Sequence, residues 1–391
     1  MHYDFETLKD RSKTDSLKWD IKDGELPMWV ADMDFVTAPE IQEAILARAN
    51  EGIYGYGIIP DEWANAYSSF WEKRHHYKIP ESSLIFATGV IPILSSAVRK
   101  LTTPAENVLI LTPVYNIFYN CIRNNGRTIL ESPLKLEGRE YSIDWDDFEE
   151  KCANPQTSLL IFCNPHNPIG KIWDRDTLAR IGEICKKYDV IVLSDEIHCD
   201  ITIPGKEYIP FAAVSDTCKE ISLTAIAASK CFNLAGLQSA AVFSENKQLH
   251  HKIYRALNTD EVAEPNAFAI SATIAALNNG QAWLDELRQY LSENRKYAED
   301  FVANEIKEAT VIPGEATYLL WFDMRNIQKD RDDLASYIRK ETGLWVSDGA
   351  AYGSTGKGFL RVNIACPRRL VEDGMKRLKQ GIEGYIAFTQ N

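Results

Sequence analysis

One lysine stands at the end of an apolar stretch of the chain. Residues 225–238 read AIAASKCFNLAGLQ, so that Lys230 follows a run of small apolar residues and Ser229. Lysine ordinarily keeps its ammonium group in water at the protein surface. The window therefore allows two interpretations: the Lys230 ammonium reaches solvent nearby, or its amine is held in a pocket where it can do chemistry.

Four further groups each follow an apolar run that is typical of a β-strand. After SSLIFA comes Thr88-Gly89, then Val90 and Ile91 before a proline. This pattern favours the start of a helix, whose free N–H groups can bind a phosphate. After NVLILTP comes Tyr115, whose ring can stack on a flat ligand or simply pack in the core.

The other two groups are an amide and a carboxylate. After SLLIFC comes NPHNPIG, in which two Asn-Pro pairs predict a rigid, non-helical turn that carries Asn167, although the turn can also be purely structural. After VIVLS comes Asp195, which either caps a helix or, if buried, needs a cation or hydrogen-bond donors. Ligands of open α/β sheets bind at the carboxyl ends of the strands, where all five groups are expected.

Together, these five groups fit pyridoxal 5′-phosphate (PLP). The amine can form a Schiff base with its aldehyde, and the carboxylate can keep its pyridine nitrogen protonated, which makes the ring an electron sink. The amide can hydrogen-bond the O3′ oxygen, the aromatic ring can stack, and the helix N-terminus can take the phosphate. Each group alone is common, whereas the ordered set predicts a PLP site.

The same motifs resemble those of the fold-type I PLP-dependent enzymes in the aminotransferase class I/II superfamily. NPHNPIG is similar to the NPxNPTG motif, and SDEIH and SKCFNLAG are similar to the aspartate and lysine motifs, in matching order and spacing over nearly the whole chain. The resemblance implies the fold-type I PLP-dependent transferase fold, with a large cofactor domain and a small domain made from both chain ends. It also implies a homodimer with active sites at the interface.

The resemblance assigns roles to single residues. Lys230 matches the Schiff-base lysine and catalytic base, Asp195 the partner of the pyridine nitrogen, and Asn167 the O3′ donor. Further matches are Tyr115 as the stacking ring, Val90 and Ile91 as backbone phosphate donors, Tyr56 as a residue that reaches the neighbouring subunit's phosphate, and Arg361 as the grip on the substrate α-carboxylate. An arginine suits a carboxylate because its planar fork binds it bidentately, but Arg361 alone can equally be an ordinary surface arginine.

Two positions depart from typical aminotransferases. His198 stands where a tyrosine is usual, and Gln238 stands where an arginine usually grips the phosphate, a task that would fall to Ser229 and the helix end. Both departures, together with the N-terminal WVADMDF, resemble the MalY/PatB-type cystathionine β-lyases, also called C–S lyases. By this resemblance His198 lies at the cofactor and Ala31 near the substrate. Asp32 and Asp34 would face opposite sides of an extended segment, and neither is assigned a catalytic role.

The expected function is therefore that of a PLP-dependent C–S lyase. It would cleave cystathionine or related cysteine S-conjugates by α,β-elimination to a thiol, pyruvate and ammonia, with Lys230 as the base. A class I/II aminotransferase is the alternative, because it uses the same cofactor residues. A PLP-fold protein that acts mainly as a regulatory binding partner is an alternative of another class.

The elements that must position these residues alternate along the chain. Apolar runs and helical patterns such as DRDTLARIGEICKKY, with Asp174 as a cap, predict an α/β fold with a mostly parallel sheet covered on both faces. After about residue 280 a long charged helix and shorter units predict a smaller α+β domain. We expect a large PLP-binding domain over 50–285, and a small domain from 1–49 and 286–391.

Composition narrows the functional classes. The 391 residues are 45% hydrophobic and 25% charged, and the formal net charge of -13 argues against binding to nucleic acid or to an anionic membrane. The polar, acidic N-terminus does not resemble a targeting peptide, and no apolar run is long enough for a membrane helix. The eight cysteines form no CxxC pair, which favours a reduced, cytoplasmic protein. The adjacent histidine pairs do not match zinc-ligand spacing, so no metal is expected.

Overall fold

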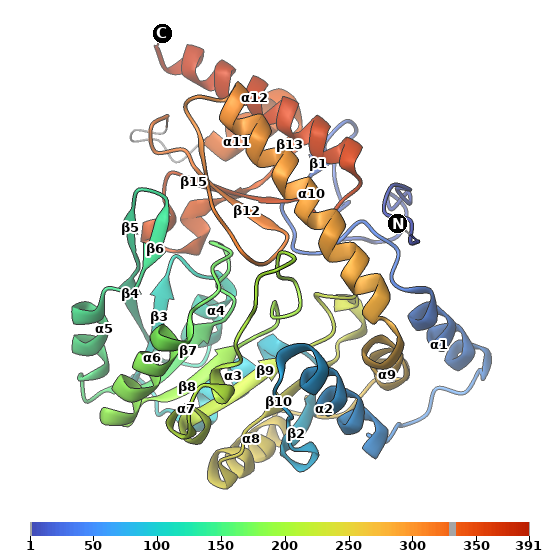
Figure 1. Cartoon of the computed structure of the whole chain (residues 1–391), viewed down its shortest axis with the longest axis vertical. Helices are drawn as coiled ribbons and strands as arrows, with labels where there is room; N and C mark the ends of the chain where they lie inside the picture. The colour runs from blue at the N-terminus through green and yellow to red at the C-terminus, as the bar shows by residue number, and fades with distance from the viewer. Residues whose placement is uncertain (1, 328–333, 391) are drawn as a thin grey trace.

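A seven-stranded sheet forms the centre of the larger part of the molecule (Figure 1). The structure is a computed structural model that describes residues 2–327 and 334–390. The strand order is β2-β10-β9-β8-β7-β3-β4, and only β10 runs antiparallel to its neighbours. The strands are β2 (Leu84–Ala87), β3 (Asn107–Thr112), β4 (Thr128–Pro133), β7 (Thr157–Cys163), β8 (Ile191–Asp195), β9 (Ser222–Ile226) and β10 (Ala240–Phe243). Each apolar run singled out in the sequence forms one of them, which confirms the mostly parallel sheet.

Helices cover both faces of this sheet because successive strand residues point to opposite sides. Leu159 and Ile161 of β7 pack on one face, whereas Leu160 and Phe162 pack on the other. The first face is covered by α3 (Val90–Leu101), α4 (Ile117–Arg123) and α8 (Lys247–Thr259), and the second by α5 (Trp145–Cys152), α6 (Arg175–Lys187) and α7 (Asp216–Ile221). Helix α6 begins as predicted, because the Asp174 side chain accepts a hydrogen bond from the Thr177 N–H.

A smaller antiparallel sheet lies towards the C-terminal end of the chain (Figure 1). Its order is β11-β12-β15-β14, with β11 (Thr310–Ile312), β12 (Leu319–Asp323), β14 (Ser347–Asp348) and β15 (Phe359–Asn363). The helices of this region are α10 (Gln281–Glu305), α11 (Leu334–Thr342) and α12 (Arg368–Gln390). Helix α10 runs from this region down to α9 beside the central sheet. The domain boundaries predicted at residues 49 and 285 stay a prediction.

The remaining elements connect these two parts. Strand β1 (Leu26–Pro27) pairs in parallel with β13 (Leu344–Trp345), and β5 (Lys135–Glu137) forms a hairpin with β6 (Glu140–Ser142). The other helices are α1 (Pro39–Asn50), α2 (Asp61–His75), α9 (Ala269–Asn279) and the short 3-10 helices η1 (Glu81–Ser83), η2 (Phe211–Ala213), η3 (Ala235–Leu237), η4 (Gly349–Tyr352) and η5 (Ser354–Gly356). Across residues 2–327 and 334–390, none of the helices combines the length and the apolar character that a bilayer crossing requires.

The N-terminal segment around WVADMDF is irregular, and this corrects one expectation. Asp32 and Asp34 were expected to face opposite sides, yet both bind the Arg11 guanidinium at 3.0 Å. Side chains two residues apart point to the same side of an extended segment, so the expectation misapplied the alternation of a strand, and the two carboxylates share one cluster of cations. The buried Lys18 ammonium completes this cluster, at 2.7 Å from Asp34 Oδ2 and 3.7 Å from Asp32 Oδ1.

The substitution Asp34→Ala tests the importance of this cluster. Lys18 is only 1% exposed, so removal of its nearest carboxylate leaves a buried ammonium with weaker partners. We expect the free energy of unfolding, measured by urea denaturation, to fall by about 3 kcal/mol. The control Lys78→Ala breaks an exposed pair with Glu72 and should cost at most about 0.5 kcal/mol. Equal losses in the two variants would contradict the structural role of Asp34.

Candidate functional site

A cavity of about 200 Å³ lies at the carboxyl ends of the parallel strands. Residues from the N-terminal segment and from the turns after β2, β3, β7, β8 and β9 line it. The structure places most of the predicted site residues in its wall: Ala31, Val90, Ile91, Tyr115, Asn167, Asp195, His198, Ser229 and Lys230. The convergence follows from the parallel sheet, which brings the ends of neighbouring strands to a single edge.

Two predicted site residues lie outside this wall. Arg361 sits on β15 just behind it, where Nη1 donates to Asn167 Oδ1 at 3.3 Å and Nη2 donates to the Trp29 carbonyl at 2.9 Å. Arg361 is buried, so it is not an ordinary surface arginine. Tyr56 is fully exposed in the segment between α1 and α2, and it does not contact the cavity of its own chain. Its predicted role at a neighbouring subunit stays a prediction.

The Lys230 amine is held inside the cavity. Nζ donates to the Ala31 carbonyl at 2.6 Å, and the Tyr318 hydroxyl donates to the same oxygen at 3.1 Å. Burial lowers the pKa of Lys230 to about 8, and repulsion from the nearby Arg361 acts in the same direction. Of the two interpretations of this lysine, the structure favours the pocket, and a pKa near 8 gives a substantial fraction of free amine at neutral pH.

Asp195 ends β8 and is buried. Its carboxylate accepts one hydrogen bond, from the Ile197 N–H at 3.2 Å, and within the described ranges it has no ion pair. Residues 197–200 form turns, so the predicted alternative of a helix cap is not what the structure has. Burial raises the pKa of Asp195 to about 7 because the charged form loses its hydration. A cationic or proton-bearing ligand atom would stabilise this carboxylate.

His198 and Asn167 leave hydrogen-bonding atoms free for a ligand. His198 is buried, and its Nδ1 has no partner among the residues that the structure describes. Burial and the Lys230 charge lower the pKa of His198 to about 3, so its imidazole is neutral. Because Asn167 Oδ1 accepts from Arg361, its Nδ2 amide is the group left to donate.

These observations fit PLP. Buried polar groups in folded proteins are nearly always paired, yet among the described residues the Asp195 carboxylate has no cation and His198 Nδ1 has no partner. A ring nitrogen that carries a proton and a phenolic oxygen would satisfy groups of this kind. The N-terminus of α3, at Val90 and Ile91, offers backbone N–H groups without intrahelical partners for a phosphate. Gln238 lines the cavity where the resemblance leads one to expect an arginine, and among the described residues of the wall Lys230 is the only lysine or arginine.

Some residues of the site were not predicted from the sequence. Tyr318 reaches Lys230 only through the Ala31 carbonyl, and it stands at the start of an ordinary apolar strand pattern. Cys163 and Ile197 line the cavity as apolar wall. A motif could have pointed to Ile197, which lies inside SDEIH, but nothing in the sequence distinguishes Tyr318 from a core residue.

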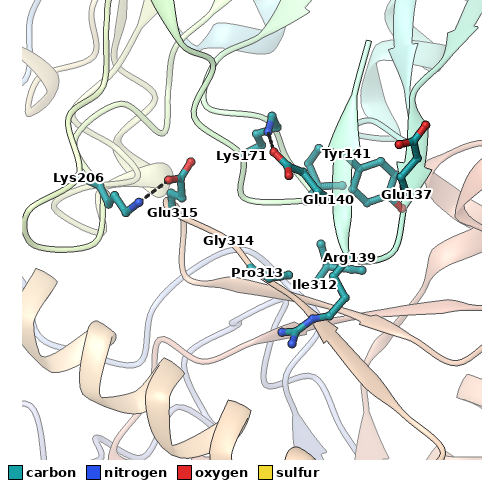
Figure 2. Close-up of a pocket in the computed structure, with 11 residues that line it drawn as sticks. Glu137, Arg139, Glu140, Tyr141, Lys171, Lys206, Ile312, Pro313, Gly314 and Glu315 are labelled. Carbon is teal, nitrogen blue, oxygen red and sulfur yellow. Dashed lines mark hydrogen bonds and ion pairs between the residues drawn. The ribbon is translucent and has the colours of Figure 1, made fainter. Parts of the chain in front are cut away.

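A larger cavity of about 650 Å³ lies elsewhere, between the β5–β6 hairpin and residues 312–315 (Figure 2). Its lysines are paired with glutamates, Lys206 with Glu315 at 2.7 Å and Lys171 with Glu140 at 3.5 Å. Arg139 donates to the Val311 carbonyl. The lysines and the arginine of this cavity thus have partners within the chain, whereas Asp195 beside Lys230 has no ion pair among the described residues.

The chain belongs to the aminotransferase class I and II family, whose model matches residues 30–378. It is 38% identical to the cystathionine beta-lyase PatB of Bacillus subtilis (strain 168), over 97% of this chain and 99% of that protein. Protein MalY of Escherichia coli (strain K12) is 31% identical over 97% and 99% of the two chains. A PLP-bound C-S lyase from Staphylococcus hominis superposes with a TM-score of 0.92 at 32% identity and 98% coverage of both chains. The predicted family and fold class are confirmed.

The substitution His198→Gln tests the burial of a neutral imidazole. In the unfolded chain a histidine binds a proton when the pH falls below its ordinary pKa of 6.5, whereas in the folded protein the pKa of His198 is about 3. Because the unfolded state then binds more protons, the wild type loses stability as the pH falls. Between pH 7.5 and 5.5 the wild type should lose about 1.4 kcal/mol relative to the variant, measured by urea unfolding. The control His251→Gln, on the exposed surface, should show no such relative change. A constant difference between wild type and His198→Gln at both pH values would contradict the inference.

Proposed function

We propose that this protein is a PLP-dependent C–S lyase that cleaves cystathionine or related cysteine S-conjugates. The single observation that carries the proposal is a buried lysine amine with a pKa near 8 that shares a cavity with an unpaired carboxylate. The full-length similarity to a cystathionine beta-lyase and to a PLP-bound C-S lyase supports elimination over transamination.

PLP, when bound, supplies an electron sink for the negative charge that develops at the Cα atom of an amino acid. Lys230 is the general base, since its amine is largely withdrawn from water and its lowered pKa suits proton removal near neutral pH. Asp195 holds a proton on the pyridine nitrogen, because a buried carboxylate without a cation gains most from such a partner.

Other residues orient the reacting groups. Asn167 Nδ2 would donate to the phenolic oxygen of the cofactor, because Asn167 Oδ1 already accepts from Arg361, and His198 would offer a neutral imidazole nearby. Arg361 has an unpaired, buried Nε atom, and its guanidinium is available to bind the substrate carboxylate. Val90, Ile91 and Ser229 would hold the phosphate of the cofactor, and Tyr115 would stack on its ring, since all four line the cavity. Ala31 lies in the wall beside Lys230, where its carbonyl keeps the free amine in place.

The overall reaction is an elimination followed by hydrolysis. Lys230 takes the proton from Cα, the Cβ–S bond breaks, and the sulfur leaves with the bond's electron pair as a thiolate. The three-carbon fragment is released as 2-aminoacrylate, which tautomerises to an imine and reacts with one water to give pyruvate and ammonia. An aminotransferase would use the same residues but needs a keto acid to complete its cycle.

The substitution Lys230→Ala tests the proposed base. Wild-type protein should form pyruvate from cystathionine with no keto acid added, and Lys230→Ala should lose at least about 10³-fold in kcat together with the visible absorbance of the linked cofactor. Lys252→Ala, at an exposed position of α8, is the matched control and should keep both properties. Pyruvate formation that depends on added keto acid would instead identify an aminotransferase.

We also propose a homodimer whose partner completes the site. Ile53, Tyr54, Tyr56, Ile58 and Ile59, here called the 53–59 strip, are all exposed in this chain. A contiguous apolar strip of this kind is typical of a protein interface. A second copy of the chain that covers the strip would bring Tyr56 to the phosphate end of its partner's cavity, where Gln238 leaves no arginine.

Hybrid dimers test this arrangement. Tyr56→Ala and Lys230→Ala homodimers should each be strongly impaired, but in a mixture that is dissociated and reassociated, half of the dimers are hybrids with one intact site. About a quarter of the wild-type sites should therefore return in a 1:1 mixture. A mixture no more active than the mean of the two variants would show that Tyr56 does not act across the interface.

The domain division and the location complete the proposal. Residues 50–285 are proposed as the large PLP-binding domain, since the described residues of the hydrophobic cluster around α3 lie between Ile85 and Ala263. Residues 1–49 and 286–391 are proposed as the small domain. A cytoplasmic location is supported by the cysteines, all eight of which are free and buried, as is typical of a reducing compartment.

A further inference from the structure

Glu196 is a buried carboxyl group that the proposed reaction does not use. It follows Asp195 and has no measurable exposure. Its Oε1 accepts from the Ser194 hydroxyl at 2.6 Å and from the Phe211 N–H at 3.0 Å. Its Oε2 is buried and has no donor within the described part of the chain. Oε1 thus has two hydrogen-bond donors, whereas Oε2 has none among the described residues.

The neighbouring side chain is that of Asn164, at the start of the NPHNPIG turn, and it lies close enough to Glu196 to lower the pKa of this carboxyl group. Asn164 Nδ2 donates to the Ile209 carbonyl at 3.0 Å, whereas Asn164 Oδ1 is buried and has no donor in the described ranges. Rotating the amide by 180° would set Oδ1 against the Ile209 carbonyl and lose that bond. Glu196 Oε2 and Asn164 Oδ1 are thus two buried acceptors, on neighbouring side chains, that have no donor among the described residues, and a proton on Glu196 would supply one.

The surroundings also favour a proton on Glu196. The titratable groups that face it are Asp195, Cys199 and Tyr77, all of them neutral or negative. No cation pairs with it within residues 2–327 and 334–390. Burial, with a smaller contribution from the adjacent Asp195 charge, raises the pKa of Glu196 to about 8, although hydrogen bonds from Ser194, Phe211 and Asn164 act to lower it.

We propose that Glu196 is a neutral carboxylic acid whose Oε2–H donates to Asn164 Oδ1 and so positions the Asn167 turn against the end of β8. The backbone already joins these segments, because the Asn164 N–H donates to the Asp195 carbonyl at 2.9 Å. The side-chain bond adds a second link one residue further along β8. Glu196 is thereby a positioning residue, and this consequence for catalysis rests on the proposed function, whereas the proton itself does not.

The proton is tested on the holoenzyme without an activity assay. In infrared difference spectra of wild type against Glu196→Gln at pH 6, a protonated-carboxyl C=O band should belong to the wild type alone. Urea unfolding gives a second readout. The folded state keeps the Glu196 proton up to about pH 8, but the unfolded chain releases it near pH 4.5. The free energy of unfolding of the wild type should therefore fall relative to that of Glu196→Gln as the pH rises from 5 to 8. The ratio of unfolding constants should change by up to about tenfold per pH unit.

Positioning is tested by rescue with an isosteric side chain. Glutamine keeps a donor for Asn164 Oδ1 and an acceptor for Ser194 and Phe211, whereas alanine keeps neither. Glu196→Ala should lower kcat at least about tenfold, and Glu196→Gln should restore most of it. Glu183→Gln on the exposed face of α6 is the control for loss of a glutamate.

The outcomes separate the two halves of the proposal. A missing infrared band together with no relative pH dependence would overturn the neutral acid, even if Glu196→Ala fails to fold. Glu196→Gln as inactive as Glu196→Ala would overturn the positioning role. If the wild type makes no pyruvate, the proposed function fails, while the infrared and unfolding measurements still decide the proton.

Discussion

The site depends on the burial of an amine and a carboxylate in one cavity without an ion pair between them. Lys230 donates to a backbone carbonyl instead of to Asp195, and Asp195 accepts only a backbone N–H. Each group is less charged than it would be in water, which destabilises the fold unless another partner arrives. The surrounding structure must therefore be rigid enough to hold both groups in a state that favours ligand binding.

Two parts of the structure hold these groups in place, the central sheet and the N-terminal segment. The central sheet fixes Asp195, Asn167 and the Lys230 turn because strands β7, β8 and β9 are parallel neighbours packed on both faces. The N-terminal segment closes the cavity from outside the sheet. Asn363 binds the carbonyls of Val30 and Asp32 on either side of Ala31. The Ala31 carbonyl is thereby fixed as the acceptor for Lys230.

The features of the site that could be predicted from the sequence are those set by residues close together in the chain. The strands and the residues that follow them were predicted, because apolar runs and turn residues are local signals and a parallel sheet gathers its strand ends. Lys230 binds the Ala31 carbonyl, which is 199 residues away in the chain, and Tyr318 binds the same carbonyl across 287 residues. Such contacts were not predicted, because a backbone atom leaves no pattern in a sequence. Asp32 and Asp34 were misjudged because the alternation rule was misapplied, since residues two apart share one side of an extended segment, where Arg11 and Lys18 bind both carboxylates.

The two departures from typical aminotransferases change the charge of the cavity. His198 is neutral and Gln238 replaces a cation, so Lys230 is the only lysine or arginine in the wall, and its own pKa is low. Little positive charge then remains inside one chain to balance a phosphate. Backbone N–H groups at the start of α3 supply part of that balance. Thr88, Ser229 and Gln238, which are neutral polar side chains of the wall, can add hydrogen bonds, so apart from Lys230 this wall offers a phosphate hydrogen bonds rather than ion pairs.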